Sequence, residues 1–101
     1  MQRRCEQIVD KSFIEMRKAM GEARQFAETC QTYKAIKKLA KAATYAGESA
    51  AATALCNIDG GFERGTVYRG LAGEVLRYLK RCLGEGATLS GFRSRARRRS
   101  R

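Results

Sequence analysis

The 101-residue sequence contains no proline, no tryptophan and no histidine. The lack of proline removes the residue that interrupts helices most strongly. The lack of histidine removes the usual general base near neutral pH and a common zinc ligand. The ten acidic residues form no local pair of carboxylates of the kind that serves acid–base catalysis. We therefore expect a protein that is not an enzyme, with no catalytic residues, no metal site and no cofactor.

Long apolar runs are also missing. No window approaches 18 consecutive apolar residues, so we expect no transmembrane span and no membrane partner. The polar start at residues 1–6 is not followed by an apolar stretch that resembles a signal peptide. These features predict a soluble protein of a reducing compartment, cytoplasmic, or nucleoid or nuclear if its partner is DNA.

The four cysteines are isolated from one another. Cys5, Cys30, Cys56 and Cys82 lie 25, 26 and 26 residues apart, and no CxxC pair occurs. Zinc sites are usually built from local pairs of ligands, and a disulfide framework needs an oxidising compartment. We therefore interpret the cysteines as free thiols that act as small core residues, and we expect the protein to fold without metal and without disulfides.

Periodicity and composition predict helices throughout the folded part. Alanine is abundant, and apolar residues from Cys5 to Cys30 recur in steps of three and four, which is the helical period. A break near 29–32, a helix over 32–46 that Gly47 closes, a further helix opened by Glu48, and a last helix capped by Thr66 would give about four helices. The expected fold is all-α, a compact helical bundle of about four helices.

The domain boundaries follow from composition. Residues 1–86 are assigned to the helical bundle domain, and residues 87–101 to a basic tail that we expect to be disordered when free. A turn is expected at 57–61, where Asn, Asp and Gly residues gather.

Positive charge is concentrated in two short segments. The formal net charge is +11, from 21 basic and 10 acidic side chains. Residues 31–47 carry four lysines and no acid, while residues 84–101 carry six arginines and one glutamate. A merely solvated surface intersperses both signs, whereas neutralising a phosphate backbone needs concentrated cations.

The predicted nucleic-acid-binding residues fall into three groups. Four lysines at i, i+3, i+4 and i+7 share one helix face, the last helix adds a weaker basic face, and the tail supplies arginines suited to bidentate phosphate contacts. In order, these are Lys34, Lys37, Lys38 and Lys41; Arg77, Lys80 and Arg81; and Arg93, Arg95, Arg97, Arg98, Arg99 and Arg101.

Two functions fit this pattern. The first is a weakly sequence-specific nucleic-acid-binding protein that contacts the phosphate backbone of DNA or RNA. The second is a structural subunit, adaptor or inhibitor whose helices pack on a protein partner, in some cases inside a nucleoprotein complex, or on a second copy of the chain. Affinity of the purified protein for naked nucleic acid separates the two.

One internal regularity remains. Gly-Glu pairs at residues 21, 47 and 73 are spaced by 26, and each glycine precedes a cysteine by nine residues. Three similar helical units would produce this pattern. Little else aligns between the blocks and Gly84-Glu85 breaks the register, so we interpret the spacing as coincidence.

Overall fold

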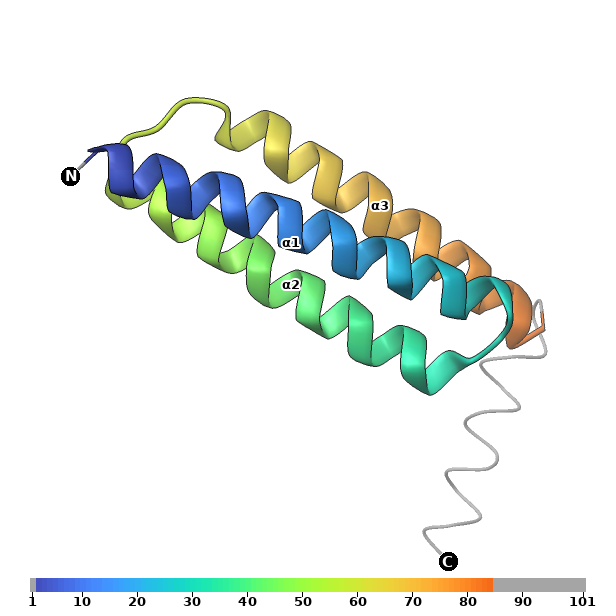
Figure 1. Ribbon diagram of the computed structural model, residues 1–101. Helices are drawn as coiled ribbons and strands as arrows, with labels where there is room; N and C mark the ends of the chain where they lie inside the picture. Colours follow the sequence, from blue (N-terminus) through green and yellow to red (C-terminus); the bar gives the residue numbers. More distant parts are fainter. Residues whose placement is uncertain (1, 85–101) are drawn as a thin grey trace, which may run out of the picture.

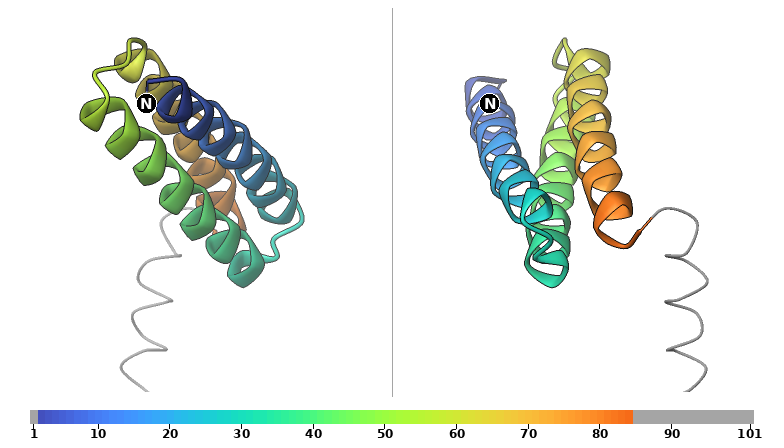
Figure 2. Two further views of the ribbon diagram at one scale, coloured as in Figure 1. Left: turned by 60° about the vertical axis from the view of Figure 1, so that its left-hand side comes forward. Right: turned by 90° about the vertical axis from the view of Figure 1, so that its right-hand side faces the viewer.

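The computed structural model describes residues 2–84, which form three helices that run side by side (Figure 1). Helix α1 spans Gln2–Glu28, α2 spans Thr32–Leu55 and α3 spans Gly61–Cys82. Helix α2 runs antiparallel to the other two (Figures 1 and 2). The all-helical class is confirmed for the described residues, and the expected count of about four helices is wrong. The expected disorder beyond residue 86 lies outside the described residues.

The predicted number of helices was too high because a helix was expected to end at Gly47, where α2 has no break. Helix α2 continues through Gly47 and Glu48 to Leu55. A glycine inside a helix costs about 1 kcal/mol relative to alanine, and the alanine-rich surroundings together with packing on α1 outweigh this cost. Ser49, which follows Glu48, is buried at 5% exposure within α2.

The start of α3 was also misplaced. The helix begins at Gly61, after Gly60 in the left-handed region with a φ of 88°. Thr66 lies inside the helix, where its hydroxyl donates a hydrogen bond of 2.9 Å to the carbonyl of Phe62, one turn earlier. Threonine makes this bond readily inside helices, so its presence does not by itself mark a helix start.

The first two helices end in the same way. Cys30 and Asn57 adopt left-handed conformations with φ of 58° and 52°. The amides of Gln31 and Ile58 then donate to carbonyls five residues earlier, at 2.9 and 3.0 Å, as in a Schellman motif. The predicted breaks near residues 29–32 and 57–61 are therefore confirmed.

The core is made mostly of small side chains. Along α1 the predicted apolar stripe is confirmed, with Val9, Met16 and Met20 each 1% exposed. Helix α2 buries Ala35, Ala42 and Ala52, whereas the bulkier Tyr33 and Ile36 are exposed. Helix α3 contributes Val75 and Leu79. Alanines let α1 and α2 pack closely, but they bury little apolar area per residue.

All four cysteines are paired. Cys5 is bonded to Cys56 at one end of the bundle, and Cys30 is bonded to Cys82 at the other. The prediction of free thiols and a disulfide-free fold is therefore wrong, because the antiparallel helices bring alternate cysteines to the same end. Disulfides persist in oxidising compartments, so the two bonds count against the expected reducing compartment.

Glycines inside α1 and α3 offer a direct test of the packing. A Cβ built at Gly21 or Gly73 meets no atom within 4 Å, so we expect Gly21→Ala and Gly73→Ala each to raise the free energy of unfolding by about 0.5–1 kcal/mol. Gly60→Ala should lower it, because φ is positive and the new Cβ would sit 2.8 Å from Arg64 Nη1. Urea denaturation measures all three variants, and a stabilised Gly60→Ala would contradict the turn geometry.

Candidate nucleic-acid interface

Two of the three groups of predicted site residues lie within the described part of the chain, and both are at the same end of the bundle. The lysines occupy the first half of α2, and Arg77, Lys80 and Arg81 occupy the last turns of α3. Both segments lie at the end of the bundle where α1 turns into α2 and where α3 ends (Figure 1). The described part of the chain also stops at this end, at Gly84, so the arginines at 93–101 are attached here in sequence. Their positions lie outside the described residues.

Charge is distributed unevenly between the two halves of the bundle. The half made of residues 17–44 and 74–84 carries ten basic and three acidic side chains. The half made of residues 2–16 and 45–73 carries five basic and six acidic side chains. We call the first the basic half. It contains all seven predicted site residues that the structure describes.

The four lysines are not equivalent. Lys34, Lys37 and Lys41 are exposed. Lys38 is half-buried, and its Nζ lies 3.1 Å from Glu22 Oε2 on α1. Residues 31–47 contain no acid, so the partner of Lys38 comes from another helix, α1.

The lysines around Glu22 change the pKa of its carboxyl group. Its pKa is lowered, chiefly because Lys38 hydrogen-bonds to the carboxylate, with Lys41 and Lys18 adding attraction at longer range. Glu22 therefore stays ionised and neutralises part of the lysine face. Of the four lysines, only Lys38 is paired with an acid among the described residues.

Aromatic rings support two of the exposed lysines. Lys34 Nζ lies 5.7 Å from the centroid of the Phe26 ring on α1, and Lys37 Nζ lies 5.5 Å from the centroid of Tyr33. Cation–π contacts of this length restrict a long side chain without neutralising it. Both ammonium groups therefore keep their charge for an anionic partner.

Arg24 connects α1 to α3 within the basic half. Its Nη1 lies 2.9 Å from Glu74 Oε1, and its Nε donates to Glu28 Oε1 at 2.9 Å. The Glu28 hydrogen bond is the largest cause of the raised pKa of Arg24, with Tyr78 and Glu74 adding to it. The guanidinium carbons of Arg24 and Arg81 both lie within 6 Å of the Tyr78 ring centroid, at 5.7 and 5.8 Å.

Sequence reasoning missed the contribution of α1 to this surface. Arg17, Lys18 and Arg24 are absent from the predicted site residues. The available signal was their position in the second half of α1, because a short turn before α2 must bring that half beside the lysines. Arg17 and Lys18 are exposed and extend the basic half along α1.

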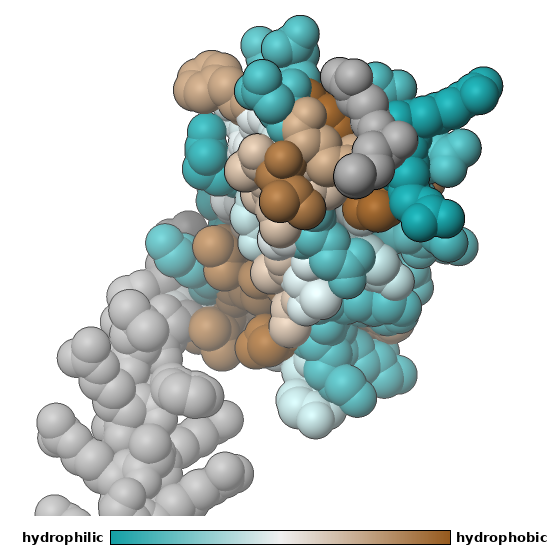
Figure 3. Space-filling view, turned by 90° about the vertical axis from the view of Figure 1, so that its left-hand side faces the viewer, coloured by the Kyte–Doolittle hydropathy of each residue, from teal (hydrophilic) through white to brown (hydrophobic). Residues whose placement is uncertain are grey.

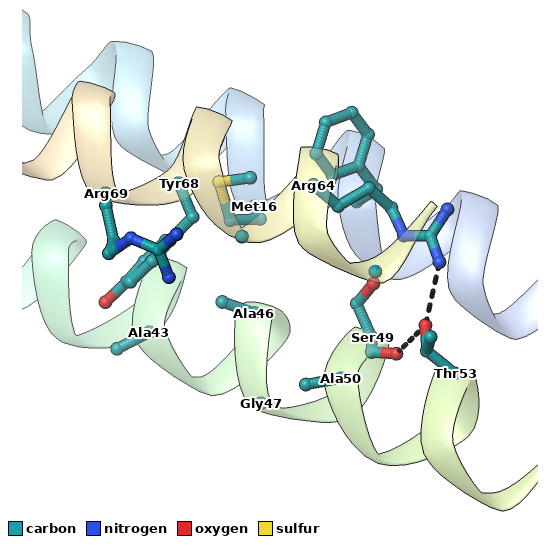
Figure 4. Close-up of a pocket in the computed structure, with 13 residues that line it drawn as sticks. Met16, Ala43, Ala46, Gly47, Ser49, Ala50, Thr53, Arg64, Tyr68 and Arg69 are labelled. Atoms are coloured by element: carbon teal, nitrogen blue, oxygen red, sulfur yellow. Dashed lines mark hydrogen bonds between the residues drawn. The ribbon is translucent and has the colours of Figure 1, made fainter. Parts of the chain in front are cut away.

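A second surface feature lies mainly in the other half of the bundle. An open groove of about 410 Å³ runs between α2 and α3 (Figure 4). We call it the α2–α3 groove. Phe13 and Met16 of α1 contribute to its lining, and its other lining residues are Ala43, Ala46, Gly47, Ser49, Ala50, Thr53, Gly61, Arg64, Gly65, Tyr68 and Arg69.

Comparison with protein-family models, with curated proteins and with solved structures gives no match for this chain. Within residues 2–84, no helix is both long and apolar enough to cross a membrane.

Proposed function

We propose that this protein binds the phosphate backbone of a nucleic acid through its basic half. The observation that supports the proposal is the charge asymmetry of the bundle, ten basic against three acidic side chains in one half and five against six in the other. Concentrated cations release counterions when they neutralise phosphates, and this release drives backbone binding with little sequence preference.

The basic half has the properties that this mode of binding needs. Lys34, Lys37 and Lys41 are exposed and stand on a helix, so docking orders only side chains and not a loop. The exposed arginines of α3 supply further donors, and the six arginines of residues 93–101 extend the charge in sequence. Because both disulfides need an oxidising environment, we propose that binding takes place there and not in the cytoplasm.

A matched pair of triple variants tests the proposal. We expect Lys34→Gln/Lys37→Gln/Lys41→Gln to weaken binding of labelled oligonucleotides by at least roughly tenfold at low salt and to lower the salt slope by about 2 units. Arg3→Gln/Arg4→Gln/Lys11→Gln removes the same charge from exposed positions in the other half, and it should change affinity by less than about threefold. Fluorescence anisotropy over a salt series measures both.

Lys38 is left unchanged in the first triple variant because it is paired with Glu22. The converse variant, Glu22→Gln, frees Lys38 and should tighten binding by about two- to threefold. Equal losses in the two triple variants would show that only net charge matters and would contradict a defined interface. Tighter binding to a sulfated polysaccharide of equal charge than to single- or double-stranded DNA or RNA would overturn the nucleic-acid assignment.

The adaptor alternative is supported by a different observation, the α2–α3 groove. All lining residues of this groove except Ala43 lie outside the basic half, which leaves room for a protein partner in the groove while the lysines contact nucleic acid.

A further inference from the structure

The α2–α3 groove is open because small residues face each other across it. Ala43, Gly47 and Ala50 form the α2 wall, and Gly61 and Gly65 form part of the α3 wall. Helices α2 and α3 contact each other less than either contacts α1. Tyr68 and Arg69 of α3 reach toward Ala43, whereas no large side chain stands between Gly47 of α2 and Gly61 and Gly65 of α3, and the seam stays open to solvent (Figure 4).

The bottom of the groove is apolar and in contact with the core. Met16 is 1% exposed and belongs to the main apolar cluster, and Phe13 packs against that cluster. Apolar patches also interrupt the hydrophilic surface in the view from the Cys5–Cys56 end (Figure 3). Large apolar side chains inserted from outside would therefore be removed from water against Phe13, Met16 and the alanines, which is a favourable change.

The charged groups along the groove are all positive. Arg64 and Arg69 contribute to its lining, and the lining contains no acidic residue. Arg64 Nη2 donates to Thr53 Oγ1 at 2.9 Å and to the Asp59 carbonyl at 3.0 Å, which fixes it at one end of the groove. Arg69 is exposed, and its one side-chain hydrogen bond within residues 2–84 is a 3.4 Å contact with Thr66 Oγ1, so its guanidinium is available to a carboxylate.

We propose that the α2–α3 groove binds an amphipathic helix of a protein partner, with apolar residues on one face and acidic residues at its flanks. The exposed ridge of Ala43, Gly47 and Ala50 has the i, i+4, i+7 spacing of one helix face, and no atom lies within 4 Å of a Cβ built at Gly47. Small residues let the backbone of a neighbouring helix approach closely. Its apolar residues then fill the groove, and its carboxylates pair with Arg64 and Arg69, so that the three-helix bundle gains a fourth helix.

Charge excludes the two occupants that the chain itself could supply. Residues 85–101 carry six arginines and one glutamate, so they cannot complement an arginine-lined groove. A second copy docked groove to groove would bring Arg64 and Arg69 of both copies together in one interface. A separate protein with acidic residues supplies the negative charge that complements Arg64 and Arg69.

The test uses the full, disulfide-bonded chain and a labelled synthetic helix. The probe peptide carries leucines at i, i+3, i+4 and i+7 with glutamates on both flanks. We expect saturable binding by fluorescence anisotropy, with chemical-shift changes at the amides of Gly47 and Gly65. A scrambled peptide of identical composition controls for general attraction to a chain of net charge +11, and it should bind at least roughly tenfold more weakly.

Neighbouring alanines provide a matched pair of variants. Ala50 lines the groove, while exposed Ala51 does not. We expect Ala50→Leu to fill the groove and weaken peptide binding by at least roughly tenfold, and Ala51→Leu to leave it within about twofold. Circular dichroism confirms that both variants keep their helices.

Four outcomes would overturn the proposal: equal binding by the Ala50→Leu and Ala51→Leu variants, equal binding of the scrambled peptide, equal binding of a peptide with lysines in place of its glutamates, or a parent dimer that Ala50→Leu dissociates. The last would assign the groove to a second copy. None of these outcomes bears on oligonucleotide binding by the basic half, which uses other residues.

Discussion

Loss of the Cys5–Cys56 and Cys30–Cys82 disulfides is expected to unfold most of the protein at 37 °C. Each bond closes a long loop, with sequence separations of 51 and 52 residues. Restricting the unfolded chain over loops of this length contributes roughly 4 kcal/mol per bond in the chain-entropy description. The two loops overlap, so their joint contribution is smaller than twice this value. The contribution of even one disulfide is a large share of the free energy of unfolding of a small domain.

The composition of the core explains why cross-links matter so much here. The largest fully buried side chains are Met16, Met20, Val9 and Val75, and most of the other buried apolar residues are alanines. Several bulky residues that could enlarge the core are exposed instead, including Leu55 at 86% and Phe62 at 78%. Small domains with limited apolar burial commonly depend on disulfides, metals or oligomerisation for stability.

Two double variants separate the bonds. Cys5→Ser/Cys56→Ser frees the end where α2 leads into α3, and Cys30→Ser/Cys82→Ser frees the end that carries the basic half. We expect each to lower the midpoint of urea unfolding strongly, and reductant to have the same effect on the parent as the two pairs combined. The parent purified without reductant should show no reactive thiol after denaturation. Four reactive thiols, or unchanged stability on reduction, would contradict the disulfide pairing.

The cysteine spacing carried more information than sequence reasoning extracted. Cysteines 25 or 26 residues apart are separated by about one helix and its turn, and consecutive helices reverse direction. Alternate cysteines therefore reach the same end of the bundle, which gives the observed first-to-third and second-to-fourth pairs. The Gly-Glu regularity has the same length, and two of its glutamates, Glu22 and Glu74, pair with basic residues of neighbouring helices.

Local patterns predicted single helices better than they predicted the bundle. The stripe along α1 was confirmed because one face of that helix packs on both neighbours. The count of helices was wrong because glycine at position 47 resembles a helix end in sequence, while in the fold α2 passes through it. Whether a helix ends at Gly47 or continues through it depends on the tertiary packing of α2 on α1, and a local sequence pattern gives no information about that packing.

The candidate interface was predicted in part for a similar reason. Helical spacing placed the four lysines on one face, but the pairing of Lys38 with Glu22 depends on how α1 lies against α2. The lysines and the α3 arginines occupy the same end because the helices alternate in direction. The α2–α3 groove had no sequence signal of its own, because Ala43, Gly47 and Gly65 are also typical of tightly packed helices.

Deletion of residues 93–101 is expected to change the salt dependence of nucleic-acid binding more than any substitution in the helices. The segment carries six arginines. Each neutralised phosphate contributes about 0.7 to 0.9 to the slope of log K against log salt, so the deletion should lower the slope by up to about 4 to 5 units. It should also slow association at low salt, because those charges steer the encounter.

The matched control replaces the six arginines by lysines. It keeps the net charge, so counterion release alone predicts a parent-like slope, whereas bidentate phosphate contacts would be lost and affinity would fall. Stopped-flow kinetics and anisotropy over a salt series measure both quantities.

The helix face should retain measurable low-salt binding after the deletion, because Lys34, Lys37 and Lys41 stay on α2. If the deletion abolishes binding while Lys34→Gln/Lys37→Gln/Lys41→Gln binds like the parent, the basic half is not the interface. The bundle would then be a disulfide-linked scaffold that presents a basic tail, and the α2–α3 groove would become its main candidate for recognition.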